Sequence, residues 1–81
     1  MRIYHTETQR DYDALMIELE EKGCKWAYGR KPTTSNDWRF QEEHTCIKLK
    51  GQAINRGDLE LFNNLHPDVP IIKYKSREEI K

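Results

Sequence analysis

The residues best suited to binding chemistry lie between Gly29 and His44, where cations, hydroxyl and amide groups and aromatic rings occur close together. Guanidinium and ammonium groups hold anions through charge-assisted hydrogen bonds, and the rings of Trp38 and Phe40 offer flat surfaces for stacking. This composition predicts a site for a small anionic ligand or another protein at Arg30, Lys31, Thr33, Thr34, Ser35, Asn36, Trp38 and Arg39. The alternative interpretation is that Trp38 closes the edge of the core while the polar residues only form turns.

A second group of basic residues suggests a different function, a small nucleic-acid-binding module that uses one face of a sheet. The residues expected on that face are Lys48, Lys50, Arg56, Lys73 and Lys75. The chain has 14 Lys and Arg against 14 Asp and Glu, so its formal net charge is zero. A neutral chain lacks the broad positive field of proteins that bind duplex DNA or anionic membranes. Nucleic acid is therefore the second choice, and solvated strand residues are the ordinary interpretation of these lysines.

Signals for metal binding and catalysis are weaker. The close spacings of zinc motifs, such as CxxC or HExxH, do not occur among His5, Cys24, His44, Cys46 and His66. Glu42, Glu43 and His44 would supply two carboxylates and a base, but adjacent residues point in different directions on a regular element. There is also no glycine-rich phosphate loop. We therefore predict a non-catalytic protein without metal or cofactor.

The element that must position these groups is a helix beginning after Thr8. Thr8 is suited to the N-cap and Asp11 to the capping-box position, while Gly23 suits the left-handed residue beyond the helix end. One helical face carries the apolar residues Tyr12, Leu15, Met16 and Leu19. After Gly23 the period changes from 3.6 to 2, which predicts a strand over residues 24–28.

The remaining chain reads as strands, one further helix and one long loop. Strands are expected at residues 2–5, 45–50 and 71–75, with a returning strand from residue 53. Residues 29–44 form the loop, with one helical turn at 37–42, and residues 76–81 form a frayed tail. A second helix is expected to start at Asp58, to end before Pro67, and to face inward with Leu61, Phe62 and Leu65. The order β-α-β-loop-β-(β)-α-β predicts a single small two-layer α+β domain with a mostly antiparallel sheet and one main helix on one face.

Length and composition limit the size of the core. A chain of 81 residues with 36% hydrophobic and 35% charged residues buries only roughly 60% of its unfolded surface, so a homo-oligomer would add useful stability. No apolar run reaches the length of about 18 residues that a membrane span needs, and no leader is recognisable, so we expect a cytoplasmic protein. In that reducing compartment Cys24 and Cys46 are expected to be buried thiols rather than a disulfide.

A longer pattern extends over nearly the whole chain. It reads TxxxYDxLMxxLEEKGxKWxxGxKPT, then N-D-W, E-H-T-C-I-x-L and P-D-V-P-I-I-x-Y, and it lies at residues 8, 12–16, 19–23, 25–26, 29, 31–33, 36–38, 44–47 and 67–74. In this pattern the chain resembles small proteins encoded by phages and prophages of low-GC Gram-positive bacteria, a family of unassigned function. The resemblance implies an accessory protein of the infected or lysogenic bacterium. Such a protein would interfere with a host system, bacterial immunity included, by binding a host protein or sequestering a nucleotide-type ligand.

Overall fold

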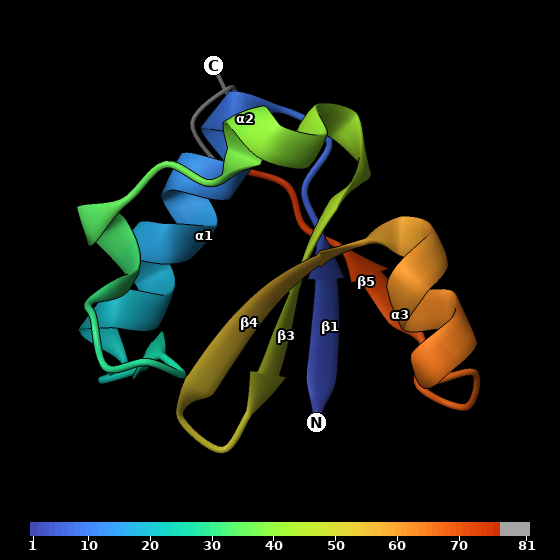
Figure 1. Cartoon of the computed structure of the whole chain (residues 1–81). Helices are drawn as coiled ribbons and strands as arrows, with labels where there is room; N and C mark the ends of the chain where they lie inside the picture. Colours follow the sequence, from blue (N-terminus) through green and yellow to red (C-terminus); the bar gives the residue numbers. More distant parts are fainter. Residues whose placement is uncertain (77–81) are drawn as a thin grey trace.

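A five-stranded sheet forms the centre of the computed structural model, which describes residues 1–76 (Figure 1). The strands are β1 (Arg2–His5), β2 (Lys25–Trp26), β3 (Thr45–Lys50), β4 (Ala53–Asp58) and β5 (Ile71–Lys73). Their order in the sheet is β2-β4-β3-β1-β5. The β1–β3 and β3–β4 pairs are antiparallel, whereas the short edge strands β2 and β5 pair parallel to β4 and β1. The predicted small α+β domain is confirmed, with a mixed sheet.

The main helix, α1 (Gln9–Glu21), covers one face of the sheet as the sequence predicts. Thr8 is its N-cap, since the Thr8 hydroxyl oxygen accepts a hydrogen bond of 3.1 Å from the Asp11 backbone N–H. At the other end Gly23 has a φ of +83°, a left-handed conformation that favours glycine. The buried side chains of this layer are Tyr12, Leu15, Met16 and Leu19 of α1 together with Cys24, Trp26, Ile47 and Ile54. This apolar layer is the main core of the domain.

A smaller helix, α3 (Leu59–Leu65), packs on the opposite face of the sheet. Asp58 caps it as predicted, because its Oδ1 accepts a hydrogen bond of 2.7 Å from the Leu61 backbone N–H. Phe62 is buried against Ile3 and Cys46, which alternate with the α1-facing residues of their strands. The predicted inward direction of Leu61 and Leu65 is wrong, because the short helix presents only Phe62 fully to this narrow second layer. No helix within residues 1–76 has the length and apolar character needed to cross a membrane.

The strand expected at residues 24–28 is shorter than predicted. It comprises only Lys25–Trp26, because the chain turns at Gly29, whose N–H donates to the Trp26 carbonyl oxygen at 2.7 Å and whose φ is +102°. Tyr28 is therefore 64% exposed instead of buried. Its ring lies parallel to the Trp26 indole, with centroids 6.0 Å apart and an interplanar angle of 3°. Tyr28 thus shields the core tryptophan from outside.

The last described residues do not fray as predicted. β5 ends at Lys73, and Ser76 is buried because its backbone N–H donates to Asp11 Oδ1 at 2.8 Å. The end of the described chain is therefore fixed along the first turn of α1. The predicted frayed tail otherwise falls on residues 77–81, which lie outside the described residues.

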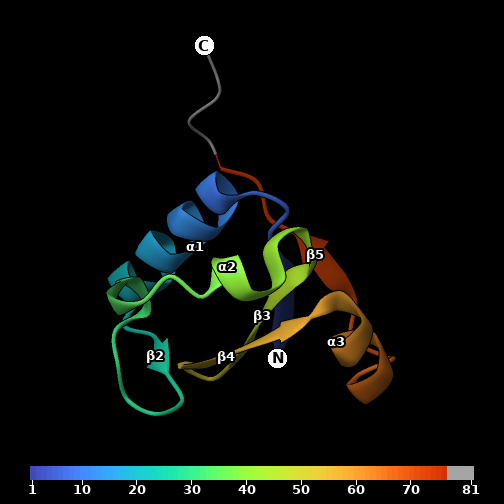
Figure 2. The same cartoon turned by 45° about the horizontal axis from the view of Figure 1, so that its top comes forward.

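The long segment between β2 and β3 contains three single turns of helix. These are η1 (Pro32–Thr34), α2 (Trp38–Gln41) and η2 (Glu42–His44), so the predicted helical turn is confirmed. Figure 2 shows the segment leaving β2, passing alongside α1 and reaching α2 in front of the sheet. The segment is thus an ordered cover at one edge of the main core.

Both cysteines are free and buried, which confirms the prediction of two thiols. They belong to different apolar clusters, since Cys24 packs in the α1 layer and Cys46 in the α3 layer. The sheet therefore lies between them.

Candidate functional site

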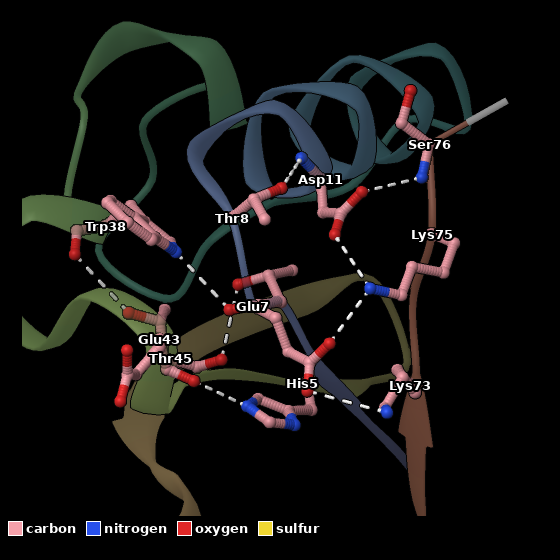
Figure 3. Close-up of polar contacts among 11 residues, drawn as sticks. His5, Glu7, Thr8, Asp11, Trp38, Glu43, Thr45, Lys73, Lys75 and Ser76 are labelled. Atoms are coloured by element: carbon pink, nitrogen blue, oxygen red, sulfur yellow. Dashed lines mark hydrogen bonds and ion pairs between the residues drawn. The ribbon is translucent and has the colours of Figure 1, made fainter. Parts of the chain in front are cut away.

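Trp38 faces the core rather than solvent. Its ring packs against the α1 layer, and the indole Nε1–H donates a hydrogen bond of 3.3 Å to the Thr6 carbonyl oxygen (Figure 3). The Trp38 carbonyl oxygen accepts in turn from the Thr45 hydroxyl at 3.4 Å. The alternative interpretation of Trp38 is therefore correct. Its ring closes the core and is not available to stack on a ligand.

Two polar residues of the predicted site, Thr33 and Asn36, hold the segment against α1. The Glu20 carboxylate accepts two hydrogen bonds from Thr33, 2.6 Å from the hydroxyl and 3.2 Å from the backbone N–H, and these bonds lower the pKa of Glu20. The side-chain amides of Asn36 and Gln9 exchange hydrogen bonds of 2.9 and 3.1 Å. These groups are thus engaged in positioning the segment.

A groove of about 390 Å³ lies between this segment and α1. Residues 33–36 line one side, and α1 contributes Tyr12, Asp13, Met16 and Ile17 to the other. The Ser35 hydroxyl at its edge is buried and has no hydrogen-bond partner within residues 1–76. Its lining contains the Asp13 carboxylate and none of the predicted cations. The structure therefore does not bring the cations and hydroxyl groups of the predicted anion site together.

Arg39, from the predicted loop site, and Arg56, from the predicted basic face, lie instead at the exposed ring of Phe40. The guanidinium carbon of Arg39 lies 4.9 Å from the centre of the Phe40 ring, and that of Arg56 lies 4.8 Å from it. Phe40 is 59% exposed. We call these three residues the Arg39–Phe40–Arg56 cluster. It offers two guanidinium groups beside one flat apolar surface, a combination that binds carboxylates or phosphates by paired hydrogen bonds.

The positions of the two arginines follow from different elements. Arg56 lies opposite Ile47 in the β3–β4 register, so it belongs to the sheet face that α1 covers. Its Nε is 3.8 Å from the Asp37 carboxylate, and its Nη1 donates to Gln41 Oε1 at 3.4 Å. The Asp37 backbone N–H donates to the Tyr12 hydroxyl at 3.2 Å, which fixes the start of α2. Arg39 and Phe40 are then carried on α2 toward Arg56.

The predicted basic face is divided between the two sides of the sheet. Lys48 and Lys50 share the α3 side, whereas Arg56 lies on the α1 side. Lys73 is at the β5 edge, 3.5 Å from the Glu7 carboxylate. Lys25, which sequence reasoning missed, joins Lys48 and Lys50 because β2 pairs with β4. A two-residue strand gives too weak a pattern to reveal that pairing from sequence.

The Cys46 thiol and the exposed His44 lie in different environments. The Cys46 thiol is buried, and burial first and the nearby Asp58 second raise its pKa to about 12. His44 is exposed, with its Nε2 3.7 Å from the Glu43 carboxylate. Within residues 1–76, no three His, Cys, Asp or Glu side chains gather in a way that would hold a metal ion.

No protein family, curated protein or solved structure was found to match this chain. A functional assignment therefore depends on the site itself. The exposed Arg39–Phe40–Arg56 cluster is the arrangement in the described residues whose chemistry is best suited to recognition.

Proposed function

We propose that this protein is a non-catalytic binding protein that recognises an acidic surface of another protein through the Arg39–Phe40–Arg56 cluster. The single observation that carries the proposal is the exposed Phe40 ring, whose centre lies 4.9 Å from the guanidinium carbon of Arg39 and 4.8 Å from that of Arg56. Arginine and aromatic side chains are enriched in protein interfaces and among the residues that dominate binding energy. Carboxylates of a partner would accept hydrogen bonds from the arginines while an apolar side chain covers the ring.

A protein partner fits this surface better than a small ligand. Small-molecule sites are concave and enclose most of the ligand, whereas the Phe40 ring stands largely exposed. The stacking residue expected for a nucleotide, Trp38, packs against the core and donates its N–H to Thr6. These two features favour the host-protein form of the function over sequestration of a nucleotide.

The resemblance to phage-encoded proteins supports a bacterial host protein as the partner. Binding would then interfere with a host system, for example one of bacterial immunity, inside the cytoplasm of the infected or lysogenic cell. The Cys46 thiol is buried and protonated at neutral pH, which supports a role without nucleophilic catalysis.

Comparative capture from bacterial lysate tests the proposal. Immobilised protein is compared with Phe40→Ala and Arg39→Gln, and with Arg10→Gln as a control that removes one positive charge from α1. We expect a protein that is retained by the native chain and by Arg10→Gln, but lost from both cluster variants. Equal retention by all four proteins would overturn the assignment of the cluster as the recognition surface.

A further inference from the structure

One face of the sheet carries lysines and no carboxylate in any of its five described strands. Lys48 pairs with Ile3, and Lys50 lies two residues further on the same side of β3. Lys50 is opposite Ala53, which is itself opposite Lys25 of β2. The register therefore places Lys25, Lys48 and Lys50 on one face, and we call these three residues the lysine face. Lys73 of β5 lies on the same side of the sheet but is paired with Glu7.

The second helix leaves this part of the sheet open. Phe62 of α3 packs on Ile3 and Cys46, near the end of β4 that continues into α3. The lysine face lies toward the β3–β4 turn, which extends away from α3 (Figure 1). Lys25 and Lys50 are exposed, and Lys48 is half-buried.

The lysine face is also free of internal ion pairs. None of the ion pairs between residues 1–76 involves Lys25, Lys48 or Lys50. Neighbouring strands are about 4.8 Å apart and residues two apart in a strand are about 7 Å apart, so the backbone positions of the three lysines lie within about 12 Å of one another. This density of unneutralised positive charge suits a polyanion.

We propose that the lysine face binds the phosphate backbone of double-stranded nucleic acid without sequence specificity. A duplex presents one negative charge per about 1.7 Å of its axis, and lysines that neutralise phosphates release its counterions. Single strands are held largely by stacking on aromatic side chains, and the described strands place no Phe, Tyr or Trp on this sheet face. The site is separate from the Arg39–Phe40–Arg56 cluster and goes beyond the proposed function.

Zero net charge is compatible with this site because the described strands place no carboxylate on this face of the sheet. Asp13 lines the groove beside α1, and Glu20 binds Thr33 on the same side of the molecule. Local binding depends on the charge that a phosphate meets within a Debye length of about 10 Å at moderate salt. The lysine face therefore acts as a local positive patch on a neutral protein.

Fluorescence anisotropy with a labelled duplex tests the inference. The native chain is compared with Lys25→Gln/Lys48→Gln/Lys50→Gln and with the control Arg10→Gln/Arg30→Gln/Lys31→Gln, which also removes three positive charges but from exposed residues outside the strands and outside the Arg39–Phe40–Arg56 cluster. For three phosphate contacts the logarithm of affinity should fall with a slope of about −2.7 against log salt, or about 40-fold between about 50 and about 200 mM. We expect the control to keep this slope and the lysine-face variant to lose binding.

Several results would overturn the inference. One is an equal loss of duplex affinity in both triple variants, and another is the absence of duplex binding by the native chain at low salt. The inference would also fall if single-stranded DNA bound as tightly as duplex, or if the protein bound anionic lipid vesicles but not duplex. If the lysine-face variant does not unfold cooperatively like the native chain, the single variants Lys48→Gln and Lys50→Gln replace it. Each should then reduce the salt slope by about 1, and an unchanged slope in both would overturn the site.

Discussion

The Asp11 carboxylate accepts a hydrogen bond of 2.8 Å from the Ser76 backbone N–H, so the first turn of α1 is joined to the end of the described chain. Its other oxygen lies 3.6 Å from the Lys75 ammonium nitrogen (Figure 3). Asp11 is itself buried. A buried carboxylate needs such partners to offset its lost hydration, and here both partners come from a segment 64 or 65 positions further along the chain.

We predict that Asp11→Asn destabilises the protein by about 2 kcal/mol, since it removes a charge-assisted hydrogen bond and the ion pair with Lys75. Urea unfolding followed by circular dichroism measures the change. Asp13→Asn, an exposed change of the same kind on α1, should alter the free energy of unfolding by less than about 0.5 kcal/mol. Equal effects of the two substitutions would show that the charge of Asp11 contributes no more to stability than that of the exposed Asp13.

We predict that Trp38→Phe lowers the free energy of unfolding by about 1 to 2 kcal/mol, because phenylalanine cannot donate to the Thr6 carbonyl oxygen and fills less of the core edge. The measurement is again urea unfolding. Phe40→Leu is the control, because Phe40 is largely exposed and should tolerate the change. A Trp38→Phe protein as stable as the native chain would mean that the indole is not part of the core.

The parts of the fold that sequence predicted correctly are those determined by neighbouring residues. The Thr8 cap, the apolar face of α1 and the left-handed Gly23 all follow from local spacing, and the structure contains each of them. The order of strands in the sheet depends on contacts between distant segments, so the position of Lys25, across Ala53 from Lys50, could not be predicted from sequence.

The structure does not gather the residues of the predicted site in one place, for a related reason. Composition shows which polar, basic and aromatic residues occur in residues 29–44, but it does not show in which direction each side chain points. Trp38 turned toward a core that lacks apolar volume, and Thr33 and Asn36 bound α1. Arg56, assigned to another face, came to lie beside Phe40 because its strand register puts it on the α1 side.

We predict that the protein loses stability in acid partly through Glu7 and Glu20. The hydrogen bond from Lys75 lowers the pKa of Glu7 below its ordinary value of 4.5, and the hydrogen bonds from Thr33 lower that of Glu20. A carboxyl whose pKa is lower in the folded state stabilises that state above its unfolded pKa, and this contribution is lost as pH falls through the folded pKa. Thermal melts between about pH 6 and about pH 3 should therefore show a steeper loss for the native chain than for Glu7→Gln/Glu20→Gln. If the melting temperatures of the native chain and the double variant fell in parallel with pH, Glu7 and Glu20 would not contribute to acid stability.

We predict that nucleotides and cyclic nucleotides leave the melting temperature unchanged. The groove beside α1 has no lining cation, and the Trp38 ring is packed inward, so neither location suits a charged base-containing ligand. A ligand at about 100 times its dissociation constant would stabilise the fold by about 2.7 kcal/mol, which a thermal melt detects readily. A shift that disappears in Arg39→Gln but persists in Arg10→Gln would favour ligand sequestration over a protein partner.

We predict that Gly57→Ala destabilises the protein through a steric conflict with Phe62. A Cβ at position 57 would lie 2.7 Å from Phe62 Cζ and 2.8 Å from its Cε2, closer than real Cβ contacts, and such overpacking costs about 1 to 3 kcal/mol. The smaller side chain in Phe62→Leu removes the conflicting ring atoms while leaving a cavity of its own. In the double variant Gly57→Ala/Phe62→Leu the added methyl group occupies part of that cavity. The combined loss in urea unfolding should therefore be smaller than the sum of the two single losses, since residues in contact do not act independently. Strictly additive losses would show that Gly57 is required for a reason other than room for the Phe62 ring.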